Sequence, residues 1–301
     1  MHASRAHIEK YVDPAQRIRA IQKGEPVPKR VIEEIASRWT QEVTRKFEAR
    51  KALRSEDRKY REKLTAKLHD ILGKDKEVVD AQKGLRAMAT RLAERKPKPP
   101  HGIQIQPQIL GGSVLSVFAP PYDTIWAQNL GDSTVNQSAE DDLGGTFGFN
   151  VQADGSAYAA AAIGTFCRPV SNNPIGHFRP FMRCSYSYVD SAWYASTAHN
   201  DGYLHARVVS MDSKFNIVKW PPDDSSFQLW SDGVSVWDDT HSVDVEDDWP
   251  GQLDVQFELA PDHVYLLWCW CECSLDDGSA SIARSNMSVR APFMVVQETN
   301  A

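Results

Sequence analysis

The spacing of apolar residues changes abruptly near residue 97, and this change constrains the fold more than any other feature of the sequence. Before it, apolar residues recur every three or four positions, the period of an amphipathic helix. After it, they alternate with polar residues, as from Leu253 to Leu259, the period of a half-buried strand. Prolines 97, 99 and 100 predict a stiff connector between them. We expect a basic helical arm over residues 1–96, a proline-rich linker over 97–101 and a β domain over 102–301.

The arm is expected to form a long helix or a helical hairpin. A short helix is expected over residues 5–22, ended by the glycine and prolines that follow. No glycine or proline occurs from Lys29 to Leu72, so a helix of about 65 Å is expected there at about 1.5 Å per residue. Gly73 and Asp75 then predict a helix stop and the N-cap of a second helix.

The β domain shows roughly ten alternating segments with no helical pattern between them. Turn signals such as Asp154-Gly155, Asn200-Asp201-Gly202 and Asp232-Gly233 separate them. This pattern predicts an antiparallel β-sandwich of jelly-roll or lectin-like type, following the helical arm. The expected strands lie around 113–118, 146–151, 156–167, 181–189, 203–211, 227–237, 253–259, 264–273, 280–290 and 293–297.

Charge is divided unevenly between the two parts. Residues 1–98 hold 26 Lys and Arg against 15 Asp and Glu, which leaves 8 against 25 for residues 99–301. The net charge is therefore +11 for residues 1–98 and −17 for residues 99–301. This division indicates either an arm that binds a polyanion or subunits that attract one another through opposite charges. Acids are interleaved with the bases at helical spacing, as in a solvated helix, so nucleic acid is not the expected partner.

Three of the five cysteines, Cys269, Cys271 and Cys273, alternate within one expected strand. The outer two would lie about 13 Å apart, too far to share one zinc ion, so a packed core strand is expected. An odd number of cysteines without a small-domain framework favours free thiols. No apolar run reaches about 18 residues, so we expect no membrane span. The N-terminus lacks the apolar segment of a secretory signal, so we expect a protein that is cytoplasmic at synthesis and that, if released, leaves by a route other than Sec.

Catalytic and metal-binding signatures are absent from the sequence. Aspartates between 223 and 277 could hold Ca²⁺ if their loops converged, but they lack a recognised spacing, and we expect no cofactor. His241-Ser242 beside Asp238, and His199 near His205, are residue types suited to acid–base chemistry that also occur together by chance. A non-enzymatic protein is expected, with a hydrolase on a sandwich scaffold as the third choice.

Loop aromatics supply the candidate ligand-binding residues. Most of the eight tryptophans in the β domain are expected in its core. Trp220 and Trp249 precede prolines, and an exposed ring there could stack on a sugar or a partner protein. Proline-containing loops add further polar and aromatic groups. The candidate binding residues are Trp220, Trp249, Tyr122, Asp123, His177 and Arg179.

A narrow apolar stripe on the long helix needs a partner, which a hairpin or neighbouring subunits could supply. We therefore expect a homo-oligomer or polymer, and the leading hypothesis is a structural or assembly protein, such as a subunit of a filament, tail-like or shell-like particle. The alternative is a lectin-like module that binds carbohydrate or a cell-surface protein and is oligomerised by its arm. The expected oligomerisation residues are Ile32, Ile35, Trp39, Val43, Phe47, Tyr60, Leu64 and Leu68.

Overall fold

Two helices and twelve strands make up the described part of the computed structural model, which covers residues 18–21, 27–72, 74–93, 113–139, 145–192, 196–221, 225–234, 240–248, 250–251, 253–278 and 281–300. The helices are α2 (Lys29–Leu72) and α3 (Lys76–Ala93). The strands are β1 (Ile18–Ile21), β2 (Val114–Phe118), β3 (Thr124–Ala139), β4 (Thr146–Cys167), β5 (Ile175–Ala192), β6 (Ala198–Met211), β7 (Ile217–Lys219), β8 (Ser225–Val234), β9 (Thr240–Asp248), β10 (Val255–Glu258), β11 (Val264–Asp277) and β12 (Ser281–Thr299).

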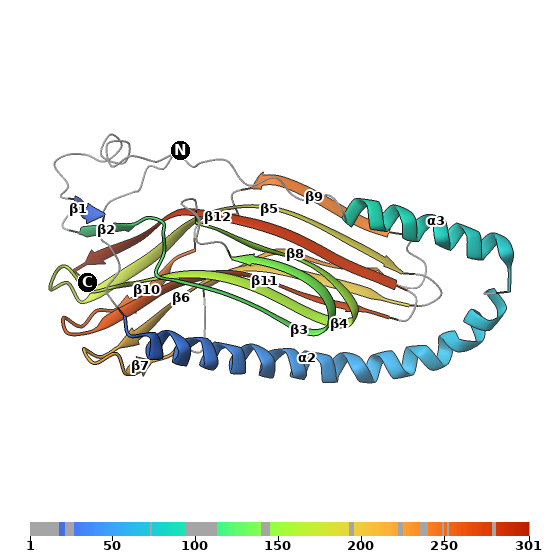
Figure 1. Ribbon diagram of the computed structural model, residues 1–301, viewed down its shortest axis with the longest axis horizontal. Helices are drawn as coiled ribbons and strands as arrows, with labels where there is room; N and C mark the ends of the chain where they lie inside the picture. The colour runs from blue at the N-terminus through green and yellow to red at the C-terminus, as the bar shows by residue number, and fades with distance from the viewer. Residues whose placement is uncertain are drawn as a thin grey trace.

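The strands form an antiparallel β-sandwich, as predicted. One sheet has the order β3-β4-β11-β6, and both β7 and β8 pair with β6. In the other sheet β5 pairs with β12, β9 and β10. The free edge of β12 pairs with β4 over residues 284–290 and with β2 over 294–298, so β4 connects the two sheets. The elongated shape follows from the length of these strands (Figure 1).

The core lies between the sheets and takes every second residue of the long strands. On β11 the inward side includes Cys269, Cys271 and Cys273, all fully buried in this cluster, which confirms the packed-strand interpretation. Burial raises the pKa of all three thiols, so they stay protonated and unreactive.

The outer face of the first sheet is covered by α2, which lies along it in Figure 1. The stripe that contacts the sheet repeats every four residues, at Val31, Ile35, Trp39, Val43 and Phe47, and all five are buried. Each step of four advances by about 40° around the helix, because an α-helix has about 3.6 residues per turn. The stripe therefore winds around α2, which suits a helix crossing a twisted sheet.

The C-terminal part of α2 runs past the end of the sandwich, and α3 returns on the opposite side (Figure 1). Asp75 caps α3 as predicted, since its Oδ1 accepts hydrogen bonds from the backbone amides of Glu77 and Val78 at 3.0 and 3.4 Å. The helix predicted over Lys29–Leu72 is confirmed at both ends. Neither described helix is long and apolar enough to span a bilayer.

The short helix expected over residues 5–22 is wrong where the structure describes it. Ile18–Ile21 form β1, which pairs in parallel with β2. Isoleucine suits a strand when a sheet edge is free to receive it, and the helical spacing could not reveal that edge. The remainder of that segment, and the linker at 97–101, lie outside the described residues.

Three of the expected turns are also wrong, because Asp154-Gly155 lies inside β4, Asn200-Asp201-Gly202 inside β6 and Asp232-Gly233 inside β8. Gly155 has a φ of 106°, close to the point where the register between β3 and β4 shifts, so it marks a bulge. Gly202 makes room for a ring, since a Cβ there would come within 2.2 Å of Trp230. Glycine within these strands serves bending and close packing rather than chain reversal.

Candidate ligand cleft and a helix-covered aromatic face

An open cleft of about 310 Å³ lies where the edges of the two sheets meet. One wall is β10 with the residues that follow it, and the other comes from the end of β6, from β7 and from Pro221. His263 and Tyr265, at the start of β11, complete the lining. A volume of this size is at the lower end of the range of about 300 to 1,000 Å³ typical of small-ligand sites.

Polar groups at one side of the cleft are ordered by hydrogen bonds. The Oγ of Ser210 lies 2.9 Å from Nδ1 of His263. The hydroxyl of Tyr265 accepts a hydrogen bond from the amide of Ala260 at 2.8 Å and donates one to the carbonyl of Glu258 at 3.1 Å. Burial raises the pKa of Tyr265, so its hydroxyl remains a neutral donor. These bonds fix the loop between β10 and β11 against the cleft.

An aromatic pair supplies the apolar part of the cleft. The rings of Phe257 and Tyr265 are 5.1 Å apart at an interplanar angle of 54°. Phe257 stands above Gly176 of β5, where a Cβ would come within 2.6 Å of its ring. The glycine therefore lets the half-buried Phe257 ring lie flat against its neighbour strand.

Two exposed residues of opposite charge, Lys219 and Glu258, also line the cleft, so the lining has no strong excess of either charge. Among the described residues, no carboxylate is hydrogen-bonded to His263, so the contact between Ser210 and His263 lacks the orienting acid of a catalytic triad. The arrangement suits hydrogen bonding to a neutral ligand better than nucleophilic catalysis.

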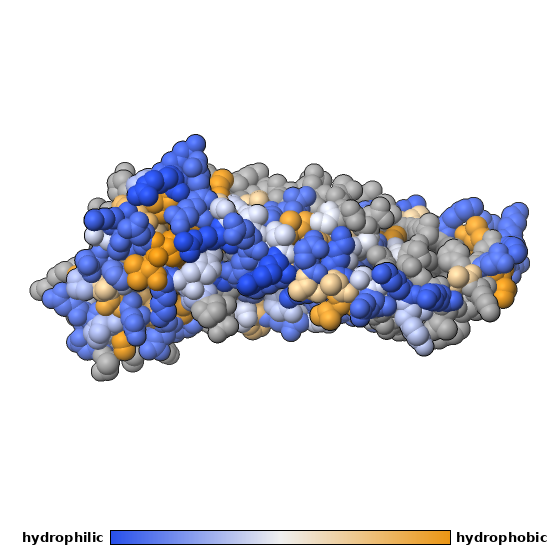
Figure 2. Space-filling view, turned by 90° about the horizontal axis from the view of Figure 1, so that it is seen from below, coloured by the Kyte–Doolittle hydropathy of each residue, from blue (hydrophilic) through white to orange (hydrophobic). Residues whose placement is uncertain are grey.

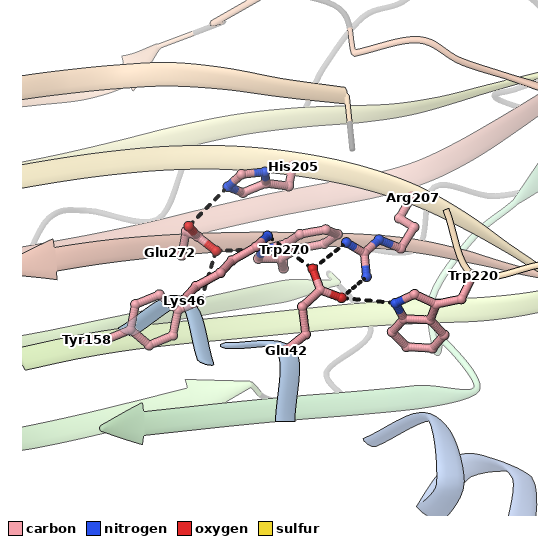
Figure 3. A network of polar contacts seen from close by, with 8 residues as sticks. All are labelled: Glu42, Lys46, Tyr158, His205, Arg207, Trp220, Trp270 and Glu272. Carbon is pink, nitrogen blue, oxygen red and sulfur yellow. Dashed lines mark hydrogen bonds and ion pairs between the residues drawn. The ribbon is translucent and has the colours of Figure 1, made fainter. Parts of the chain in front are cut away.

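A second cluster of aromatic and charged groups lies under α2 and is anchored by Glu42 (Figure 3). Its carboxylate accepts two hydrogen bonds from Arg207, both 2.9 Å, and one from Nε1 of Trp220, also 2.9 Å. Lys46 lies 3.0 Å away. Burial alone would raise the pKa of Glu42, but the hydrogen bonds from Arg207 and Trp220 lower it from 4.5 to about 2. Glu42 is therefore an ionised anchor that joins the helix to a guanidinium only 1% exposed.

The sheet below this anchor carries a second carboxylate, the half-buried Glu272 (Figure 3). It accepts hydrogen bonds from Tyr158 at 2.8 Å and from Nε1 of Trp270 at 3.0 Å, and Nε2 of His205 lies 3.4 Å away. Burial opposes its ionisation, but His205, Trp270 and Tyr158 together hold the pKa of Glu272 well below its usual range. The His205 ring stacks on Trp270 at 4.7 Å and 10°.

Trp39 of α2 inserts its ring into this aromatic face. Its centroid lies 3.4 Å from that of Trp126, 4.3 Å from that of Trp268 and 5.3 Å from that of Trp270. The first half of the predicted oligomerisation stripe thus has a partner within its own chain. In this half Ile35, Trp39, Val43 and Phe47 are buried on the sheet and Ile32 is half-buried.

The second half of that stripe is described at one side chain only. Tyr60 is 71% exposed, and the side chains of Leu64 and Leu68 lie outside the described residues. Oligomerisation through the stripe stays a prediction, and Tyr60 is the described member of its second half that the sandwich leaves uncovered.

Of three predicted binding residues, two have structural roles and the third lies outside the described residues. Tyr122 is buried in the core and donates a hydrogen bond to the carbonyl of Ala291 at 2.8 Å. Asp123 accepts hydrogen bonds from Thr165 Oγ1 and the amide of Phe166, at 2.6 and 2.8 Å, and so ties the start of β3 to β4. Trp249 lies outside the described residues.

Of the other three predicted binding residues, His177 and Arg179 lie together and Trp220 lies elsewhere, and none of the three lines the cleft. His177 and Arg179 share the carboxylate of Asp254, at 3.1 and 2.7 Å, on the outward side of β5. Trp220 is half-buried and packs edge-on against Trp268, 6.5 Å between centroids. The structure does not bring the six predicted residues into one site.

The cleft residues Ser210, Lys219, Phe257, His263 and Tyr265 were not candidates in the sequence. The sequence did point to a neighbouring residue, because the predicted binding residue Trp220 is flanked by Lys219 and Pro221. These two residues line the cleft, while Trp220 itself turns toward α2. The alternation around β10 also marked Phe257 as inward-facing. What was missing is the pairing of β10 with β5, which brings this edge opposite β6 and β7.

Buried and half-buried aspartates lie together where β5, β6 and β8 meet. Asp190 is fully buried, and Asn200 Nδ2 approaches its Oδ1 at 3.5 Å, while its Oδ2 has no hydrogen-bond partner among the described residues. Asp232 accepts hydrogen bonds from Tyr188 at 3.0 Å and the Gly233 amide at 2.7 Å, and His241 Nδ1 lies 3.1 Å away. Burial, and then the charge of Asp232, raises the pKa of Asp190 well above 3.8.

We expect Asp190→Asn to stabilise the protein increasingly as the pH rises. Above about pH 3.8 the unfolded chain releases this proton and the folded chain keeps it, so wild-type stability falls with pH until the folded-state pKa is passed. Asparagine resembles the neutral carboxyl group and removes this loss. Urea unfolding of both proteins at several pH values measures it, with Asp244→Asn on the exposed side of β9 as control. A difference that does not change with pH would contradict the assignment.

Comparison with known proteins places this chain in no family. No family model and no curated protein matches it. A xylan-binding domain of carbohydrate-binding module family 22 aligns over 58% of this chain and 92% of its own, with 12% identity and a TM-score of 0.21. The family 22 and catalytic modules of Clostridium thermocellum xylanase 10B, complexed with xylohexaose, match with 13% identity and a TM-score of 0.17.

A third match is the enzymatically active domain of tailspike protein 4 of bacteriophage CBA120, with 10% identity and a TM-score of 0.19. The alignments cover 55% of this chain and 26% of the xylanase structure, and 57% and 19% in the tailspike comparison. At TM-scores this low the matches establish no shared function. The sandwich is defined by the chain's own strand pairing.

Proposed function

We propose that this protein is a non-catalytic carbohydrate-binding protein whose β-sandwich takes a neutral, hydroxyl-rich ligand in the cleft between β10 and β6–β7. The observation that carries the proposal is the lining of that cleft. It combines the rings of Phe257 and Tyr265 with the polar groups of Ser210 and His263.

A sugar ring offers both kinds of contact that such a lining can make. Its C–H face packs on an aromatic ring, and its hydroxyls exchange hydrogen bonds with side chains and backbone. The two charged residues at the cleft, Lys219 and Glu258, have opposite signs, which favours a neutral ligand over an anion or a cation. The cleft is open along a sheet edge, so a chain longer than the cleft could extend beyond it.

Phe257→Ala is expected to weaken binding of a neutral oligosaccharide by about tenfold, since loss of one aromatic contact costs about 1 kcal/mol or slightly more. Isothermal titration calorimetry against oligosaccharides of glucose, xylose, galactose or mannose, followed by gel retardation in soluble polysaccharides, measures it. Phe227→Ala is the matched control, because Phe227 is 41% exposed on β8 and does not line the cleft.

We expect Phe257→Ala to fold and to bind about tenfold more weakly, and Phe227→Ala to bind like the wild type. Equal losses in both variants would place the site elsewhere. No binding of any of these sugars by the wild-type protein would refute the proposal outright.

A further inference from the structure

The contact between α2 and the sheet joins two surfaces from separate parts of the chain. Neither surface uses any residue of the segment that connects the helices to the sandwich. Residues 31–47 of α2 supply the apolar stripe and the Glu42 carboxylate. The sheet supplies the tryptophan face and Arg207. Residues 94–113 connect α3 to β2, and a segment of that length can extend to at most about 70 Å.

We propose that α2 docks on the aromatic sheet face of a second copy of this chain as well as on its own, so that copies exchange arms and self-assemble. An exchanged arm makes the same contacts that the structure shows within one chain. The balance between the closed and exchanged forms is then set by protein concentration, by the connecting segment and by contacts that only the exchanged form makes.

Charge favours a second copy as the partner. The arm region carries an excess of +11 over residues 1–98, and the remaining residues carry −17. Within one chain this attraction already forms a pair between Arg54 and Asp201 at 3.4 Å. The same attraction steers the arm of one copy toward the sandwich of another.

The distal half of α2 gives the exchange a further gain. Leu53 is 76% exposed, Tyr60 71% and Ile71 66%, on a helix that extends beyond the sandwich. Figure 2, which views the molecule from the α2 side, shows hydrophobic groups at both ends and near the middle of a mostly hydrophilic surface. In an exchanged pair the second copy's distal helix can cover these side chains.

Two charge-reversed chains test the exchange. Glu42→Arg places a cation against Arg207, and Arg207→Glu places an anion against Glu42, so each variant alone repels its own arm. In a mixture, only an exchanged heterodimer satisfies both contacts. The introduced arginine on one arm then meets the introduced glutamate on the other chain's sheet, while the native Glu42 and Arg207 pair in the second contact. We expect light scattering to show dimeric mass in the mixture and monomer in each variant alone.

Carrying both reversals on one chain is the control, because it restores the pair within the chain and should behave as wild type. If either single variant fails to fold, the less buried pair is used, with Arg54→Glu mixed with Asp201→Arg. Mixtures that stay monomeric while the doubly reversed chain is folded overturn the proposal. So does dimerisation of each single variant alone, since that would show association through another surface.

A second measurement uses the wild-type contact unchanged. All five native cysteines are buried, so a cysteine introduced at the exposed Lys83 of α3 accepts a dye selectively. Mixing donor-labelled with acceptor-labelled protein should give energy transfer that rises with concentration and is lost in the Trp39→Ala variant. Energy transfer that is absent at every concentration, or undiminished in Trp39→Ala, contradicts arm exchange.

Discussion

Glu42→Ala should lower the free energy of unfolding by about 3 to 5 kcal/mol, the usual cost of removing one partner of a buried ion pair. The cost arises on the sheet, because Arg207 is 1% exposed and loses both of its hydrogen bonds to the helix. Its guanidinium is 5.3 Å from the ring centres of Trp220 and Trp270. These rings leave little room for water to accept the hydrogen bonds that Glu42 accepted. Urea denaturation measures the change.

The same pair allows a test of what the charges contribute. Replacing both partners, as Glu42→Leu with Arg207→Met, should restore most of the stability, because two packed apolar side chains leave no unpaired charge behind. A double variant as unstable as the two single variants added together would show that the residues act independently. That result would contradict the network drawn in Figure 3.

Acid should weaken the same anchor. The pKa of Glu42 is about 2 in the folded protein and 4.5 in the reference state, so its contribution is fully present above about pH 4.5 and is lost as the pH falls toward 2. The Glu42→Ala variant should therefore lose less stability than wild type across that window. Because Glu42 keeps some contact with solvent, the size of the difference will be smaller at high salt.

Trp39→Ala should cost about 3 to 5 kcal/mol through the cavity it leaves among buried aromatic rings. Trp39 is 2% exposed and is surrounded by Trp126, Trp268 and Trp270. Hydrogen exchange should show faster exchange along residues 31–47 of α2, with the amides between the two sheets less affected.

Leu53→Ala is the matched control for that change, since Leu53 lies on the same helix with 76% of its surface exposed. It should alter the free energy of unfolding by less than about 0.5 kcal/mol, as other exposed substitutions do. If both variants lose similar stability, the docked segment of α2 extends beyond Phe47.

The fold class could be predicted because it depends on local periodicity. A stretch without glycine or proline gave α2 from Lys29 to Leu72, and alternation gave most of the strands. The strands missed altogether were β3, β7 and β9, and β1 was taken for part of a helix. β9 carries mostly acidic and polar residues and is largely exposed, so it has no apolar alternation to detect.

The location of the arm and of the cleft could not be predicted, because both depend on strand order. The four-residue spacing of Ile35, Trp39 and Val43 indicated a helix in need of a partner, but the partner face is assembled from β3, β4, β6 and β11. Arg207 gave no signal either, since a single arginine in an alternating strand looks like an outward, solvated residue. Only the pairing of β6 with β11 places it beneath α2.

The unbroken course of α2 has a mechanical consequence. From Arg54, which pairs with Asp201 of β6, the helix continues to Leu72 and forms a lever of about 27 Å at about 1.5 Å per residue. A load at its tip acts first on this ion pair and reaches Phe47, Val43 and Trp39 only after the pair opens. The arm would then peel away turn by turn under a pull from the tip, while a pull along the helix axis must break the whole stripe together.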